Sequence, residues 1–189
     1  SAASDVYKRQ LKNLPKLSKK NILDIGTGSG CIIISIIKER ENCKATAIDK
    51  SLKALKVAKL NAEMHHVQKK IKFLNIDVDK YFANKYDLIV SNPPYIKDIE
   101  ILSLDKDVKL NEPKLALSGG KSGLNKVFKV IKKSQKLLKT NGKLILEIGF
   151  KQSKEVKKYL IKNNFNQIHV FKDLSRKDLS LIHISEPTR

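Results

Sequence analysis

The apolar residues of the chain gather in short runs that are separated by polar turns and by longer amphipathic stretches. Short apolar runs have the length of buried strands, at residues 21–25, 44–48, 71–74, 86–91, 142–148 and 167–171. Longer stretches with helical spacing or a helix cap lie between them, at residues 31–39, 51–64, 122–138 and 152–161. This alternation predicts a series of β–α units.

Strands that alternate with helices are joined by right-handed crossovers, and these build a parallel sheet covered on both faces. The pattern therefore predicts an α/β protein with a doubly wound, Rossmann-like sheet that is mostly parallel. Ligands of such sheets bind at the carboxyl ends of the strands. Every motif discussed below falls at such an end.

The length and composition of the chain favour a single domain of a cytoplasmic protein. The 189 residues are 41% hydrophobic and 31% charged, which suits one soluble domain. The sequence has no apolar run of about 18 residues that could span a membrane. Its two cysteines, Cys31 and Cys43, fit neither a disulfide framework nor a metal-binding motif. We expect free thiols, no metal site and a monomer.

The formal net charge of +20 raises the question of a nucleic-acid partner. Only four of the 39 basic residues are arginine, although phosphate recognition favours the guanidinium group. The lysines are spread along the chain without interleaved aromatic residues. We therefore interpret them as a solvated surface, and we expect nucleic acid not to be required.

The two ends of the chain differ in composition from the middle and correspond to each other at the DNA level. A DNA that encodes residues 5–10 (DVYKRQ) has a reverse complement that encodes LSLIHI, the sequence of residues 179–184. This is expected of a transposon end used in sequencing-library preparation. We interpret residues 1–10 and 179–189 as adapter-derived tails, and residues 11–178 as a fragment of one domain.

The glycine-rich loop Gly26-Thr27-Gly28-Ser29-Gly30 follows a predicted strand and opens a predicted helix, an arrangement that lets a ligand approach the backbone. Its GxGxG spacing differs from the GxGxxG of dinucleotide-binding folds. Asp49, at the end of the second strand, is placed to accept from ribose hydroxyls. Asp77 and Val78, after the third strand, are placed to bind an adenine. The loop and these residues predict a nucleoside cofactor, although such turns also occur without one.

Asn92-Pro93-Pro94-Tyr95 ends the fourth strand, at the same edge of the sheet. An amide or aromatic amine nitrogen is a weak nucleophile, so an enzyme must hold its N–H groups and aim its lone pair at a methyl sulfonium. The side-chain oxygen of Asn92 and the carbonyl of Pro93 could accept the two N–H groups, and Tyr95 could stack on the planar group. A tight turn is the alternative interpretation.

These motifs together resemble those of the HemK/PrmC family, the release factor glutamine methyltransferases, over nearly all of residues 21–178. Further stretches similar to the family's motifs follow in the same order: Asn111-Glu112-Pro113, Leu115-Ala116-Leu117, Gly119-Gly120, Gly123-Leu124, Leu146-Glu147-Ile148-Gly149 with Gln152, and Lys172-Asp173-Leu174. The resemblance implies a class I methyltransferase fold. It also implies methyl transfer from S-adenosylmethionine to the glutamine of the GGQ tripeptide in a release factor.

The resemblance gives cofactor roles to residues 26–30, Asp49, Val78 and Asn92, and substrate roles to residues 92–95. Two departures from the family are visible. The N-terminal helical domain that helps to dock the release factor is absent from the sequence given, and residues 179–184 stand where the last antiparallel strand is expected. We expect this segment to form such a strand. Other open functions are methylation of a ribosomal-protein glutamine, methylation of an adenine in DNA or rRNA, and inactive nucleotide binding.

Overall fold

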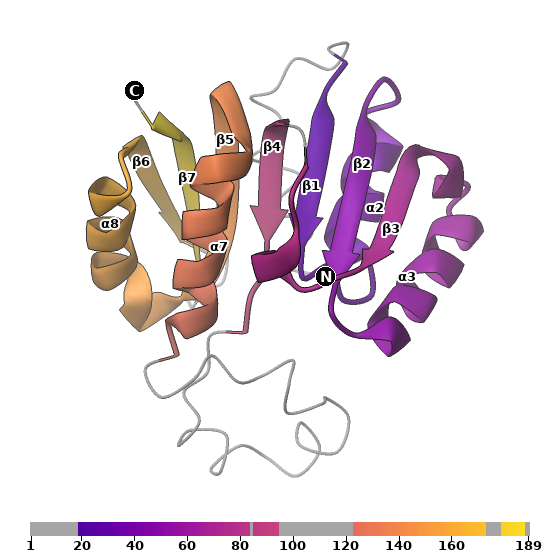
Figure 1. The fold of residues 1–189 in the computed structure, drawn as a ribbon, viewed down its shortest axis with the longest axis horizontal. Helices are drawn as coiled ribbons and strands as arrows, with labels where there is room; N and C mark the ends of the chain where they lie inside the picture. Colours follow the sequence, from indigo (N-terminus) through magenta and orange to yellow (C-terminus); the bar gives the residue numbers. More distant parts are fainter. Residues whose placement is uncertain (1–18, 84, 95–122, 173–178, 188–189) are drawn as a thin grey trace, which may run out of the picture.

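A computed structural model of the chain describes residues 19–83, 85–94, 123–172 and 179–187. Figure 1 shows one twisted sheet with helices on both of its faces. The strands are β1 (Asn21–Ile25), β2 (Lys44–Asp49), β3 (Ile71–Asn75), β4 (Tyr86–Ser91), β5 (Leu138–Gly149), β6 (Phe165–Lys172) and β7 (Leu179–Pro187). The α-helices are α2 (Cys31–Glu39), α3 (Leu52–Met64), α7 (Asn125–Leu137) and α8 (Ser153–Lys162).

The described strands lie in the order β3-β2-β1-β4-β5-β7-β6. The first five are parallel neighbours, and β7 runs antiparallel to both β5 and β6. The chain builds outward from β1 to β3 in one direction and from β4 to β6 in the other, so the strand order reverses between β1 and β4. The predicted doubly wound, mostly parallel sheet is confirmed.

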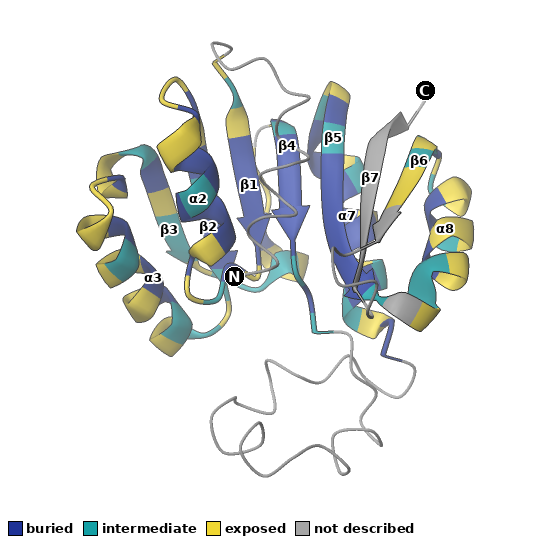
Figure 2. Ribbon diagram, turned by 180° about the vertical axis from the view of Figure 1, so that it is seen from behind, coloured by how far each residue is buried: buried dark blue, intermediate teal, exposed yellow. Residues whose placement is uncertain are grey.

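The two faces of the sheet carry separate cores because the crossovers on either side of the reversal place their helices on opposite faces. Apolar residues of α2 pack with Ile22, Ala47 and Val90 on one face. Residues of α7 and α8 pack with Leu23 and Ile89 on the other. Figure 2 shows α2 in front of β2, with α7 behind the sheet. The dark blue central strands there are buried on both faces, which accounts for their continuous apolar runs.

Several element boundaries differ from the prediction. Helix α7 covers residues 125–137 of the helix predicted over 122–138, and β5 begins at Leu138 instead of Gly142. The extra residues of β5 include Asn141, whose φ of 59° and neighbouring register shift break the strand's alternation, so the periodicity missed them. The strand predicted at residues 179–184 is confirmed as part of β7, whereas the division of the chain at residues 10 and 178 stays a prediction.

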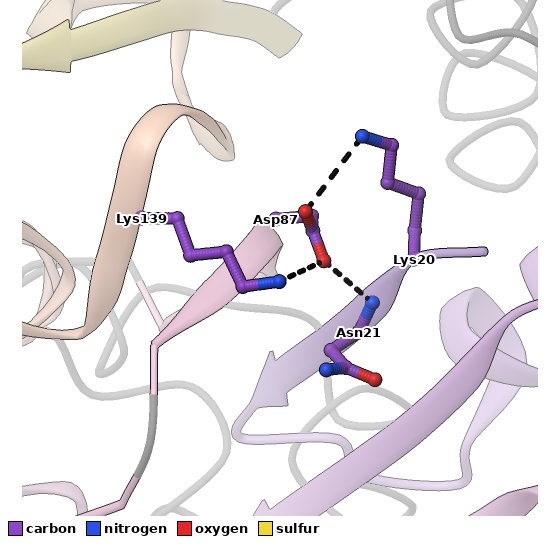
Figure 3. Close-up of polar contacts among 4 residues, drawn as sticks. All are labelled: Lys20, Asn21, Asp87 and Lys139. Carbon is purple, nitrogen blue, oxygen red and sulfur yellow. Dashed lines mark hydrogen bonds and ion pairs between the residues drawn. The ribbon is translucent and has the colours of Figure 1, made fainter. Parts of the chain in front are cut away.

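Asp87 connects three strands at the amino end of the sheet, away from the loops that follow the strands (Figure 3). Its Oδ2 accepts from the backbone N–H of Asn21 at 2.8 Å and from Nζ of Lys139 at 2.9 Å. Nζ of Lys20 lies 3.7 Å from its Oδ1. Burial alone would raise the pKa of Asp87, but these donors together lower it.

Within the described ranges, none of the helices has the length and apolar character that crossing a membrane requires.

Candidate cofactor and substrate site

The glycine-rich loop lies at the carboxyl end of β1, beside the point where the strand order reverses. The backbone N–H groups of Gly26 and Thr27 both donate to the carbonyl of Ile48, at 2.9 and 3.1 Å. These bonds join the start of the loop to the end of β2. The loop is therefore fixed to two neighbouring strands before helix α2 begins.

Helix α3 supports the far side of the same loop. Gly30, the residue before α2, has a φ of 81°, and a Cβ there would lie 3.0 Å from Cδ1 of Ile34 and 3.2 Å from Cβ of Ala58. The position thus requires glycine both for its backbone angle and for its close packing. The side-chain amide of Asn61, on α3, donates to the carbonyl of Ser29 at 2.9 Å.

Asp49 lies against the middle of the loop, as its position at the end of β2 predicts. Its Oδ2 accepts from the backbone N–H of Gly28 at 2.9 Å, and its Oδ1 accepts from the N–H of Ser51 at 2.8 Å. Each carboxylate oxygen can accept more than one hydrogen bond. The side chain is therefore held in one orientation and still has acceptor capacity for a ligand's hydroxyl groups.

Asp77 and Val78 follow β3 at the same edge of the sheet. The backbone N–H of Ile76 and the side-chain amide of Asn75 both donate to the carbonyl of Asp49, at 3.1 and 3.0 Å, which ties the ends of β2 and β3 together. Oδ1 of Asp77 then accepts from the N–H of Asp79 at 2.9 Å and caps the short 3₁₀ turn η2 (Val78–Lys80).

The Asn-Pro-Pro segment begins directly beside the glycine-rich loop. Ser91, the last residue of β4, pairs with Ile25 of β1, and its hydroxyl donates to the Ile25 carbonyl at 2.7 Å. Asn92 therefore follows at the level where Gly26 opens the loop. Pro93 is buried, and Asn92 and Pro94 are half-buried. Tyr95 lies outside the described residues, as does the stretch over residues 111–120.

Asp24 is a site residue that the sequence analysis missed. It lies within β1, is 1% exposed, and accepts from the Thr27 hydroxyl through Oδ2 at 2.7 Å. Its Oδ1 is buried and has no hydrogen-bond partner among the described residues. Burial raises the pKa of Asp24 to about 7; the Thr27 hydrogen bond opposes this shift, and the charge of Asp49 adds to it. The sequence feature that could have identified Asp24 is a carboxylate within an apolar strand, just before a glycine-rich loop.

The arrangement fits a nucleoside that carries a cationic amino-acid end. A buried carboxylate oxygen without a partner suits an ammonium group, because the opposite charge would offset the cost of burial. The structure also leaves open space where Cβ atoms would stand at Gly26 and Gly28, so a ligand can approach the backbone there. Among the described residues, no group of three or more His, Cys, Asp or Glu side chains could hold a metal ion.

Comparison with known protein families matches residues 5–109 to the methyltransferase small domain, which is more than half of the chain. The chain belongs to this family. The prediction of a methyltransferase is thereby confirmed, and the matched residues include the glycine-rich loop, Asp24, Asp49 and the Asn-Pro-Pro segment.

Curated relatives of this methyltransferase domain agree with the predicted resemblance. A release factor glutamine methyltransferase of Thermodesulfovibrio yellowstonii is 40% identical over 162 residues, which cover 85% of this chain and 58% of the relative. A bifunctional methyltransferase of Rickettsia typhi is 39% identical over 167 residues, which cover 88% of this chain and 32% of the relative. The chain thus spans about three-fifths and about one-third of the two relatives. The predicted resemblance to the release factor glutamine methyltransferases is confirmed.

Solved structures with the same fold include the ribosomal protein L11 methylase of Lactobacillus delbrueckii subsp. bulgaricus. It covers 98% of the chain, and the chain covers 79% of it, with a TM-score of 0.71 and 17% sequence identity. At this identity the likeness shows the fold, and it confirms that the predicted class I methyltransferase sheet is the right architecture.

Proposed function

We propose that this methyltransferase domain transfers a methyl group from S-adenosylmethionine to the side-chain amide nitrogen of the GGQ glutamine in peptide chain release factors. The observation that carries the proposal is the position of Asn92 and Pro93, directly after the Ser91–Ile25 pair and beside the glycine-rich loop. The relatives named as release factor glutamine methyltransferases support the choice of substrate.

S-adenosylmethionine supplies an electrophilic methyl group when it is bound. Under the proposal, Asp49 accepts from its ribose hydroxyls, Asp77 and Val78 receive its adenine, and Asp24 receives its ammonium group. The loop over residues 26–30 provides backbone N–H groups and close approach. The acceptor capacity of Asp49 and the unpartnered Oδ1 of Asp24 support the roles proposed for these two residues.

Asn92 and Pro93 act on the other reactant. The side-chain oxygen of Asn92 and the carbonyl of Pro93 accept the two N–H groups of the glutamine amide, so that its nitrogen lone pair is directed at the methyl group. The nitrogen would gain the methyl group as the sulfur–methyl bond breaks, S-adenosylhomocysteine would leave with the bonding electron pair on its sulfur, and the nitrogen would release one proton to solvent. The two acceptors stabilise the positive charge that develops on the nitrogen before the proton leaves, so no strong base is needed. Tyr95 would stack on the amide plane, and Pro94 would keep the segment rigid.

We further propose that the protein is a cytoplasmic monomer that acts on a protein substrate and does not need nucleic acid. The test incubates the chain with methyl-labelled S-adenosylmethionine and, in separate reactions, with a release factor carrying GGQ, a release factor carrying GGA, ribosomal proteins or nucleic acid. Label in the GGQ protein alone supports the proposal. Label in a ribosomal protein or in nucleic acid, with none in the release factor, replaces it by one of the alternative methyltransferase functions.

Two variants make the test specific to the site. Asn92→Ala removes one of the two proposed acceptors, and it should lower kcat by about a hundredfold or more while S-adenosylhomocysteine still binds. Asn42→Ala is the matched control, because Asn42 is exposed between α2 and β2, away from the loops that follow the strands. It should leave the rate unchanged.

A further inference from the structure

Helix α7 carries a buried lysine whose charge has no role in the proposed chemistry. Lys133 is 8% exposed, although lysine side chains are seldom buried without a partner. Its Nζ donates to the backbone carbonyl of Asp79 at 3.2 Å and lies 4.0 Å from the ring centroid of Phe82. Both partners belong to the segment that directly follows Asp77 and Val78.

The neighbouring turn of the same helix makes a second contact with that segment. Lys129, four residues before Lys133, forms an ion pair with the Asp79 carboxylate. Helix α7 thus holds Asp79 by its side chain and by its backbone. Phe82 is 81% exposed, so its ring lies over the ammonium of Lys133 instead of in the core. The cation–π contact gives this exposed ring a defined position.

The other contacts of the segment fix its two ends. At the start, Asp77 caps the turn by accepting from the N–H of Asp79. At the end, the hydroxyl of Tyr81 lies 2.5 Å from that of Tyr86 on β4, inside the core. Between these ends, the 3₁₀ turn leaves the carbonyl of Asp79 to be satisfied from outside, and Lys133 provides the donor.

We propose that Lys133 and Lys129 are positioning residues that hold the turn over residues 77–81 in the shape that binds the adenine of the cofactor. Neither lysine touches the cofactor, and both act through Asp79. This inference rests on the proposed function, since Asp77 and Val78 receive the adenine only if the ligand is a nucleoside. It adds α7, from the second half of the fold, to the determinants of cofactor affinity.

The test measures binding of S-adenosylhomocysteine and of methylthioadenosine, which lacks the amino-acid end, by calorimetry. Lys133→Met keeps the apolar stem and removes the ammonium. It should weaken both ligands by the same factor, about five- to tenfold, because they share the adenine. Lys129→Met breaks a more exposed pair and should weaken both about twofold. Lys132→Met, at an exposed position of the same helix, is the matched control and should change neither.

A second readout does not depend on any ligand. Hydrogen exchange of the Lys80 and Tyr81 amides, which close the turn, should be faster in Lys133→Met than in the parent and the control. A lower melting temperature with unchanged ligand affinities and unchanged exchange would reduce Lys133 to a purely structural residue and overturn the inference. If the parent binds methylthioadenosine and Lys133→Met binds it less well, the inference stands even when no release factor is methylated.

Discussion

The side-chain amide of Asn61 donates a hydrogen bond to the backbone carbonyl of Ser29, and this contact joins helix α3 to the loop that is proposed to bind the cofactor. The two residues are 32 positions apart in the sequence. Together with the packing of Ala58 against Gly30, the contact makes α3 a support for the loop as well as a cover for the sheet.

Asn61→Ala should weaken S-adenosylhomocysteine about fivefold, because one hydrogen bond of about 1 kcal/mol no longer fixes the loop. Calorimetric titration measures the effect. Glu63→Ala, at an exposed position two residues further along α3, is the control and should bind like the parent. Equal affinities of Asn61→Ala and the parent would mean that the loop keeps its shape without α3.

Asp49→Asn should remove the discrimination for ribose hydroxyls. The parent is expected to bind S-adenosylhomocysteine at least tenfold more tightly than its 2′-deoxy analogue, since a hydrogen bond to a charged group contributes about 1.5–3 kcal/mol. The amide of the variant cannot accept at both of its polar atoms, so the variant should bind the two ligands about equally. A preference for the ribose form that survives in Asp49→Asn would assign hydroxyl recognition to another residue.

The affinity for a cationic ligand should rise with pH because of Asp24. Its folded-state pKa of about 7 means that half of the unliganded molecules carry a proton there near neutral pH, and an ammonium group requires the charged form. Binding of S-adenosylhomocysteine should therefore release a proton below about pH 7 and strengthen as the pH rises to that value. Calorimetry in buffers of different ionisation enthalpy measures the proton, and Asp24→Asn should abolish it.

The same residue affects stability in the unliganded state with the opposite trend. The raised pKa means that the folded state holds the proton more tightly than the unfolded state does. The contribution of Asp24 to stability is complete below about pH 4 and is lost as the pH rises through about 7. Asp24→Asn should flatten this part of the profile in urea titrations. Parallel profiles of variant and parent would contradict the raised pKa.

Asp87 should produce the reverse dependence at acid pH. Its pKa is lowered in the folded state, so its contribution is present above the unfolded value near 4 and is lost as the pH falls through the folded pKa. Asp87→Asn should cost about 2 kcal/mol of unfolding free energy at pH 7 and little at a pH below the folded pKa of Asp87, because protonation then removes its charged hydrogen bonds. A cost that is the same at both pH values would mean that packing, not charge, explains it.

Much of the site was predictable because parallel strands bring their carboxyl ends to one edge. The glycine-rich loop, Asp49, Asp77 and Asn92 each follow a predicted strand, and the fold places those strand ends side by side. The roles given to these residues stay predictions. Asp24 was not predicted as a site residue, because strand alternation alone classifies it as a core position. Only the structure shows that one of its carboxylate oxygens lacks a hydrogen-bond partner among the described residues.

The contacts by which helices α3 and α7 support the site could not be predicted from the sequence, for a different reason. Asn61 and Lys133 lie on helices where polar residues are ordinary, and no local pattern separates a solvated lysine from one that is buried against a carbonyl. Such contacts depend on how α3 and α7 pack on the sheet. The boundary errors in β5 have a similar origin, because strand pairing with β4 extends β5 past its apolar run.

Strand β7 has a consequence for the order in which the sheet assembles. Its first pair with β6, Lys172 with Ser180, joins residues that are eight positions apart in the sequence. Its first pair with β5, Gly149 with Leu179, joins residues that are 30 positions apart. Closing the shorter loop is faster and costs less entropy. We expect β6 and β7 to form a hairpin first and then to dock on β5 as one unit. The pairing between β5 and β7 is then expected to be the first part of the sheet that is lost on unfolding.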